Sequence, residues 1–251
     1  MLIPNPWDCG TALVMQDLGF KALATTSAGL AFSQGIKEDR LQLDVKLQHC
    51  RDIARITDIP VSADMQKCFA DTPEGVADVI DQVMETGVAG CSIEDASGDP
   101  DMPVFEYSLA VERVQAAAER VQHNDPDFVL TARSENYLCG RKDLNDTLSR
   151  LQAFEKCGAD VLYAPGLPSI MEIESVCKGL SKPVNAIVGR ANTGFQLQEL
   201  IEAGVKRISV GSLFYRMAMG QLGDLAKTFL DGDLQFSGRE IPFSDFNRIC
   251  E

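Results

Sequence analysis

The sequence predicts a (β/α)8 TIM barrel, an α/β fold, as a single domain over residues 1–251. Eight short apolar runs each end near Gly, Asn, Asp or Ser, and an amphipathic stretch follows each run. Runs that are apolar on both faces are typical of a parallel sheet covered by helices. No Gly-rich dinucleotide fingerprint follows the first run, which disfavours an open doubly wound sheet. Eight units without a linker therefore favour one closed barrel.

The elements follow in order along the chain. The expected strands are residues 2–5, 22–26, 61–64, 90–94, 128–132, 160–164, 183–188 and 207–210. Residues 27–40 are expected to form a loop, which is followed by a helix that ends at residue 56. The other helices are expected over 9–18, from 72 onward, over 107–121 and 144–157, and from near Ser169, Thr193 and Leu213. Thr72-Pro73-Glu74 predicts a helix start, with an N-cap, a proline at the first helical position and an acid in the first turn.

Residues 231–251 form a polar tail with scattered apolar side chains. We expect this tail to pack on its own barrel or on a neighbouring subunit, with the C-terminal helix exchanged between subunits as one arrangement.

The chain is strongly acidic. It has 23 basic and 37 acidic residues, a net charge of −14. Such a surface repels nucleic acid and anionic membranes, so neither is an expected partner. It also repels anionic metabolites, so a site for them needs a local arginine or a metal ion.

The cysteines predict a reducing compartment. Eight cysteines are scattered along the chain without a CxxC pair, in a protein too large to need disulfides. The first residues lack the basic region of a signal peptide, and no apolar run approaches the ~18 residues of a membrane span. We therefore expect a cytoplasmic protein.

Charged residues stand at the ends of three consecutive predicted strands. Asp64 ends the third, Glu94-Asp95 the fourth, and Arg133 follows the fifth. The C-terminal strand ends of such barrels carry catalytic residues. Asp64 and Glu94 are therefore expected to hold Mg²⁺, or alternatively Mn²⁺, and Arg133 to clamp an anionic substrate. The two histidines, His49 and His123, are expected to face solvent, which argues against zinc.

Structural alternatives stand beside these assignments. Each acid can instead cap a helix or pair with a nearby base, and Arg133 can form a buried ion pair with Glu135 or Glu94. The small residues after the second strand, from Thr25 to Gly29, can cradle an anion or simply form a turn. Weaker candidates are two cysteines, a lysine and a rival phosphate site, namely Cys68, Cys139, Lys67, and Gly189 with Gly211-Ser212.

Six motifs in order resemble the isocitrate lyase/phosphoenolpyruvate mutase superfamily over residues 1 to about 230. They are Asn5-Pro-Trp-Asp8, Thr25-Thr-Ser-Ala-Gly-Leu30, Val61-Ser-Ala-Asp64, Ser92-Ile-Glu-Asp95, Thr131-Ala-Arg133 and Pro183-Val-Asn185. The similarity is greatest to the short carboxyvinyl-carboxyphosphonate phosphorylmutase-like or oxaloacetate decarboxylase-like branch.

The resemblance implies a Mg²⁺-dependent enzyme that cleaves or rearranges C–C or P–C bonds through a pyruvate enolate. It implies that Asp64 and Glu94 hold the metal largely through waters, and that Arg133 clamps the substrate. Ser27, Ala28 and Gly29 would bind the substrate carboxylate, Glu135 would support the site from behind, and Asn185 would line the pocket. Oligomers are usual in this superfamily, so a homodimer or homotetramer is expected.

The sequence departs from the superfamily pattern at several positions. Ser62 stands where an Asp is usual, Gln66 replaces an acid, and residues 68–70 replace a Gly-Tyr-Gly turn. Residues 96–105 lack the Cys and His of isocitrate lyases and the Lys and Asn of phosphonopyruvate enzymes. Chemistry that depends on that loop is therefore not expected.

The favoured hypothesis is a lyase that decarboxylates a small 2-oxo dicarboxylate such as oxaloacetate, because loss of CO₂ needs an electron sink and no nucleophile. A lyase acting on a substituted malate, a 2-hydroxy dicarboxylate, is the near alternative, with Glu135 as its base. Further alternatives are a P–C bond enzyme, a phosphate-binding barrel enzyme and a catalytically silent member.

Overall fold

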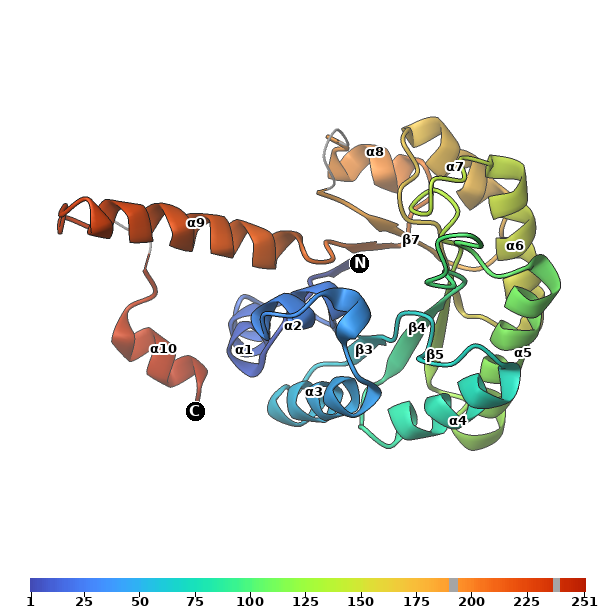
Figure 1. Ribbon diagram of the computed structural model, residues 1–251, viewed down its shortest axis with the longest axis horizontal. Helices are drawn as coiled ribbons and strands as arrows, with labels where there is room; N and C mark the ends of the chain where they lie inside the picture. Colours follow the sequence, from blue (N-terminus) through green and yellow to red (C-terminus); the bar gives the residue numbers. More distant parts are fainter. Residues whose placement is uncertain (190–193, 237–239) are drawn as a thin grey trace.

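The computed structural model describes residues 1–189, 194–236 and 240–251, and its central element is one parallel sheet (Figure 1). The strands are β1 (Leu2–Ile3), β2 (Leu23–Ala24), β3 (Val61–Asp64), β4 (Gly90–Glu94), β5 (Val129–Arg133), β6 (Val161–Tyr163), β7 (Val184–Ile187) and β8 (Arg207–Ser209). The helices are α1 (Cys9–Asp17), α2 (Ser27–Ser33), the 3-10 turn η1 (Glu38–Arg40), α3 (Leu43–Ile56), α4 (Pro73–Met84), α5 (Tyr107–Asn124), α6 (Leu144–Cys157), α7 (Ile170–Lys178), α8 (Leu197–Glu202), α9 (Leu213–Leu230) and α10 (Phe243–Ile249).

The sheet curls into a barrel. Each strand from β2 to β8 pairs in parallel with the next, and β8 pairs with β1. At the remaining seam, the Ala24 N–H donates to the Pro4 carbonyl at 3.0 Å, and the Asn5 amide donates to the Thr25 carbonyl at 3.1 Å. The predicted (β/α)8 barrel is confirmed, and the carboxyl ends of its strands meet at one mouth.

The apolar core lies between the barrel and its helices. It includes Leu23, Ile53, Ile80 and Leu130 on one side of the molecule, and Leu151, Phe154, Leu162 and Val176 on the other. The inside of the barrel carries polar side chains instead, including Thr131, Asn185 and Ser209. Burial outside the sheet therefore stabilises the fold, while the inside is available for a polar site.

One predicted loop was wrong. Residues 27–40 contain the helix α2 and the turn η1. Thr26 caps α2 by accepting from the Gly29 N–H at 3.2 Å. A Cβ at Gly29 would lie 2.5 Å from the Thr26 methyl, so only glycine fits there. Seven residues are too few to show a helical period in the sequence.

Helix starts elsewhere follow the sequence signals. Thr72 and Ser169 cap α4 and α7 with their side chains, as expected. The expected helix start at Thr193 lies outside the described residues, and α8 is described from Leu197. Among the described helices, none combines the length and the apolar character that crossing a bilayer requires.

His49 corrects another expectation, because its side chain is buried and not solvent-facing. Its Nε2 contacts the Trp7 carbonyl at 3.0 Å, and its buried Nδ1 has no hydrogen-bond partner in the described chain. Burial and the nearby Lys46 ammonium lower the pKa of His49 to about 3. His123, in contrast, is exposed as expected.

The burial of His49 predicts that the folded protein loses stability in acid. The unfolded chain protonates His49 below pH 6.5 and the folded chain does not, so the stabilisation is complete above pH 6.5 and is lost as pH falls toward 3. Between pH 7 and 5 we expect a loss of about 2 kcal/mol from this group. Urea unfolding of His49→Gln, which keeps a donor for the Trp7 carbonyl, should show a correspondingly smaller loss. An unchanged pH dependence would contradict the assignment.

The C-terminal segment leaves the barrel. The helix α9 extends outward as an arm, and α10 turns back toward α1 (Figure 1). Arg248 of α10 pairs with Asp17 of α1 at 2.6 Å. No residue of α9 is buried. The Phe229 ring contacts Phe236, with 6.1 Å between the ring centroids, but much of the apolar surface of the arm is exposed.

Candidate active site

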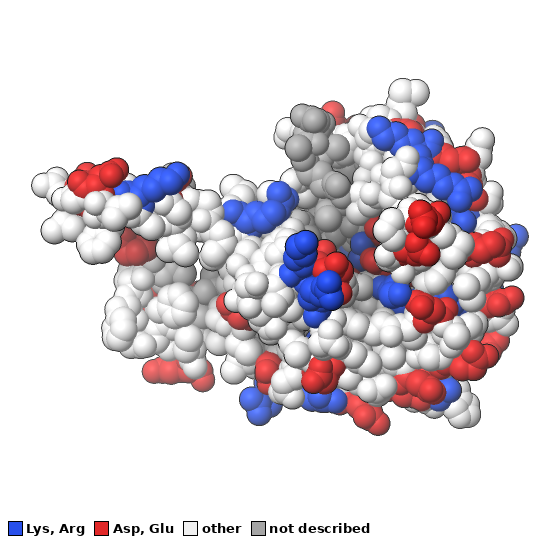
Figure 2. All heavy atoms as spheres, viewed as in Figure 1, with Lys and Arg blue, Asp and Glu red and all other residues white. Residues whose placement is uncertain are grey.

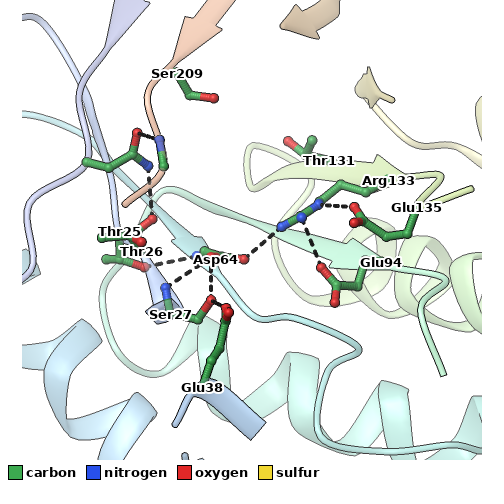
Figure 3. A network of polar contacts seen from close by, with 12 residues as sticks. Thr25, Thr26, Ser27, Glu38, Asp64, Glu94, Thr131, Arg133, Glu135 and Ser209 are labelled. Atoms are coloured by element: carbon green, nitrogen blue, oxygen red, sulfur yellow. Dashed lines mark hydrogen bonds and ion pairs between the residues drawn. The ribbon is translucent and has the colours of Figure 1, made fainter. Parts of the chain in front are cut away.

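Arg133 is the centre of a cluster of acids at the mouth of the barrel (Figure 3). It ends β5, with Glu94 beside it on β4 and Tyr163 beside it on β6. Its guanidinium contacts Asp64 at 3.0 Å, Glu94 at 3.1 Å and Glu135 at 2.9 Å. It also stacks over the Tyr163 ring, 5.1 Å from the centroid. One cation thus contacts three carboxylates.

The pKa values of the acids in this cluster shift in opposite directions. Burial raises the pKa of Asp64, but Arg133, Lys46 and the Ser27 hydrogen bonds outweigh it, so the pKa of Asp64 is lowered. Burial raises the pKa of Glu94 well above its usual range, and the neighbouring carboxylates add to this effect against the opposing Arg133. The pKa of Glu135 is raised for the same reasons. Three carboxyl groups thus share the single cation of Arg133.

Asp64 is fixed by the start of α2. The Ser27 N–H donates to its Oδ2 at 3.0 Å, and the Ser27 hydroxyl donates to the same oxygen at 2.8 Å. Negative charge at a helix N-terminus is stabilised by the unpaired N–H groups there. Ala28 lines the adjoining cavity, whereas the Gly29 N–H is already bonded to Thr26. Of the three predicted residues, Ser27 contacts Asp64 directly and Ala28 lines the cavity, whereas Gly29 is not among the lining residues.

A cavity of about 200 Å³ lies inside the mouth of the barrel. Asp64, Arg133 and Ser27 line it together with Asn185 and Ser209. Asn185 donates to the Ser209 hydroxyl at 3.1 Å. The predicted pocket residue Asn185 therefore lies in the same cavity as Asp64 and Arg133, whereas Glu94 lines a neighbouring cavity with Glu38.

Glu135 and Asp95 are held by a second ion-pair network. The Glu135 N–H donates to Asp95 Oδ1 at 2.7 Å, and Asp95 pairs with Arg150 at 3.1 Å. Arg150 in turn pairs with Asp146 at 2.8 Å. Asp95 thus fixes the backbone that carries Glu135, and its carboxylate belongs to this buried network and not to the Arg133 cluster.

Several residues of the site were missed in the sequence. Glu38 lines the cavity, its Oε1 contacts the Ser27 hydroxyl oxygen, and burial raises the pKa of its carboxyl group. Lys46 is fully buried and donates to Thr25 Oγ1 at 3.0 Å. Arg207 lines the cavity from β8. Nothing in the sequence pointed to Glu38, because it stood in a predicted loop. Arg207 could have been recognised, because it is a charged residue at the start of an otherwise apolar barrel strand.

The weaker candidates lie elsewhere or are already bonded. Cys68 is fully buried and burial raises the pKa of its thiol to about 12, so it is no nucleophile. Lys67 pairs with Asp71 at 2.6 Å. The Gly211 N–H donates to Asn5 Oδ1 at 2.9 Å, so the rival phosphate site lacks that donor. All eight cysteines are free.

The donors at the mouth fit a divalent cation with oxygen ligands. Asp64, Glu94 and Glu38 supply carboxylates and Ser27 a hydroxyl, without histidine or thiolate. Among the described residues, no three acidic, histidine or cysteine side chains converge as ligands by themselves. Mg²⁺ commonly takes one or two carboxylates and completes its shell with water and substrate oxygens. The excess of acid over base is what such an ion would balance.

A parallel barrel with carboxylates and an arginine at its mouth defines a class of small-molecule enzyme site. The family model for phosphoenolpyruvate phosphomutase matches residues 1–230, so the chain belongs to this family, within the isocitrate lyase/phosphoenolpyruvate mutase superfamily. The resemblance expected from the motifs is therefore confirmed.

Individual relatives show the range of this superfamily. The chain is 28% identical to a probable 2-methylisocitrate lyase 2 of Corynebacterium glutamicum, over 92% of this chain and 78% of that protein. It is 25% identical to an oxaloacetate decarboxylase of Pseudomonas fluorescens, over 85% and 74%. A putative lyase/mutase from Burkholderia cenocepacia J2315 has a similar crystal structure, with a TM-score of 0.94 and 44% identity over 98% of this chain and 89% of that one.

Proposed function

We propose that this chain is a Mg²⁺-dependent carbon–carbon lyase that decarboxylates a small 2-oxo dicarboxylate of the oxaloacetate type. The observation that carries the proposal is the Arg133 guanidinium, which contacts Asp64, Glu94 and Glu135 at the edge of a cavity of about 200 Å³. Ligand sites are commonly ~300–1,000 Å³, so this cavity suits a small metabolite.

The residues have separable roles in this reaction. Arg133 uses three of its five N–H groups on acids, which leaves two for a substrate carboxylate. Asp64 and Glu94 would hold Mg²⁺, with Glu38 close by. When bound, Mg²⁺ would supply positive charge where negative charge develops on the 2-oxo oxygen.

Decarboxylation then places few demands on the protein. The bond to the departing carboxylate breaks, CO₂ leaves, and the electron pair moves into the 2-oxo group as an enolate. A proton must afterwards reach the carbon that lost CO₂. Glu135, buried with a raised pKa, is the acid available for this transfer.

The loop after β4 favours this assignment over loop-dependent chemistry. Ala96 and Val104 form an antiparallel bridge, and the Ser97 N–H donates to the Pro103 carbonyl at 3.1 Å. The segment 96–105 contains no Cys, His or Lys to act on a substrate. A reaction that needs only an electron sink is compatible with such a loop.

A substituted-malate lyase is the second candidate. Cleavage of a 2-hydroxy dicarboxylate requires a base for its hydroxyl proton, and Glu135, whose pKa is raised by burial, is the base proposed for it. The relationship to the 2-methylisocitrate lyase supports this option.

The test is pyruvate release from a panel of 2-oxo and 2-hydroxy dicarboxylates, with Mg²⁺ and with EDTA. We expect turnover of one compound that EDTA abolishes and that Asp64→Asn lowers by about 10³-fold. Asp71→Asn, on an acid outside the cavity, is the matched control and should keep its activity. Turnover that persists in EDTA would contradict the metal assignment, and no turnover of any compound would favour a silent member.

We further propose that the protein self-associates through α9, as a homodimer or homotetramer, and that it acts in the cytoplasm. Five apolar side chains on one side of α9 are at least 37% exposed, namely Phe214, Met217, Leu222, Leu225 and Phe229. Charged side chains are dispersed over the barrel, whereas much of the visible arm is uncharged (Figure 2). A second copy, with the same apolar helix, is the occupant that such a self-complementary surface fits.

The free thiols of all eight cysteines support a reducing compartment, as proposed for a cytoplasmic protein.

A further inference from the structure

Arg207 is a cation inside the barrel without an acidic partner. It opens β8, two residues before Ser209, and lines the same cavity as Arg133. Its Nε donates to Asn185 Oδ1 at 2.9 Å, and one terminal nitrogen donates to Thr131 Oγ1 at 2.9 Å. Both acceptors are neutral. Burial, with Arg133 adding to it, lowers the pKa of Arg207 to about 10.

Other arginines inside the protein are compensated differently. Arg133 contacts three carboxylates, and Arg150 contacts Asp95 and Asp146. Arg113 donates to three backbone carbonyls, those of Glu94, Lys67 and Ala70. Arg207 has two neutral acceptors for five N–H groups.

No carboxylate of the described chain lies within ion-pair distance of Arg207. The residues outside the description, 190–193 and 237–239, contain no Asp or Glu in their sequence. The chain therefore has no internal counterion to offer. A partly buried cation without a counterion is unfavourable for folding, so a fold that keeps one beside a cavity suggests that an anion binds there.

The two ends of the cavity differ in charge. The acids Asp64 and Glu38 line it at the carboxyl ends of the strands, whereas Arg207, the first residue of β8, lies farther from those ends and bonds to neutral groups. Arg133 at the mouth is already shared among three acids. A molecule with two anionic ends would find the mouth suited to one end, with Mg²⁺ and Arg133, and the floor suited to the other.

We propose that Arg207, with Asn185 and Ser209, forms a second anion subsite that binds the distal carboxylate of a small dicarboxylate. This inference rests on the proposed function for the identity of the other end, and it names Arg207 as the residue that selects dicarboxylates over monocarboxylates. Asn185 acts as a positioning residue, since its amide joins Arg207 to Ser209.

The test compares binding of succinate, butyrate and inorganic phosphate by calorimetry at a fixed Mg²⁺ concentration. None of these needs to react, so the result is independent of turnover. We expect wild type to bind succinate more tightly than butyrate, which has the same chain length with one carboxylate fewer. Arg207→Met should weaken succinate binding by about 10- to 100-fold, as loss of a charged hydrogen bond does, and leave butyrate binding unchanged.

Lys206→Met is the matched control. It makes the same change of charge and side chain one position away, at an exposed residue. It should leave the preference for succinate intact. A loss of preference in this variant would mean that general surface charge, and not the subsite, sets it.

Stability provides a second readout. Without ligand, Arg207→Met should have a thermal midpoint equal to or above that of wild type, because it removes a charge that no acid compensates. A large fall in the midpoint would show that Arg207 serves the fold, and would overturn the proposal. Equal loss of succinate and butyrate binding, no loss of either, or an Arg207-dependent affinity for phosphate alone would also overturn it. Arg207-dependent succinate binding without any pyruvate release would retire the proposed decarboxylation and leave the subsite standing.

Discussion

Arg133→Met is expected to lower the free energy of unfolding by about 3–5 kcal/mol, as removal of one member of a buried ion-pair group does. The Arg133 side chain is only 14% exposed, and its partners Asp64, Glu94 and Glu135 are 20%, 16% and 5% exposed. Methionine keeps most of the volume, so the change isolates the charge. Three carboxylates would be left without their common cation.

The activity of Arg133→Met should fall together with its stability. If the proposed decarboxylation is correct, Arg133→Met should lower kcat/KM for pyruvate release by at least about 10³-fold, because both substrate binding and charge stabilisation are lost. Arg133→Lys keeps a charge but cannot contact three acids and a substrate at once, so it should recover stability better than activity. Urea unfolding and steady-state kinetics on the same preparations measure both effects.

Arg120 provides the control for this experiment. It also contacts two acids, Asp81 and, at 4.0 Å, Asp78, but on the outside of α4 and α5. Because exposed pairs contribute less than about 1 kcal/mol, Arg120→Met should change stability little and leave activity unchanged. Equal losses in the two variants would contradict the view that burial makes the Arg133 cluster different.

The double variant Leu225→Glu/Phe229→Glu is expected to convert the protein from a dimer or tetramer to a monomer. Both side chains are at least 47% exposed on the arm formed by α9. Two carboxylates placed in an apolar interface would have to be desolvated without partners, which opposes association strongly. Light scattering at micromolar concentration measures the mass directly.

Met171→Glu is the matched control for the arm. Met171 is 74% exposed on α7, away from α9, and a charge there should not change the mass. A monomeric wild type would refute the proposed self-association, whatever the variants do.

The barrel and the residues at its mouth could be predicted from the sequence. Eight apolar runs with intervening amphipathic stretches specify parallel strands covered by helices, because each element must bury its apolar side. Strand ends then place Asp64, Glu94 and Arg133 at one rim, since parallel strands present their carboxyl ends together. The motifs that carry the family resemblance stand at these same positions, so both arguments led to the same residues.

Which charges pair and which remain uncompensated could be seen only in the three-dimensional structure. Asp95 was grouped with the rim acids in sequence, yet it pairs with Arg150. Glu38 enters the site from a segment read as a loop, and His49 is buried where exposure was expected. Arg207 lacks an acidic partner, a fact visible only when every neighbour across the barrel is in place. Strand and helix periods arise from local geometry, whereas ion pairing and burial depend on side chains distant in sequence, and those determine the electrostatics of the site.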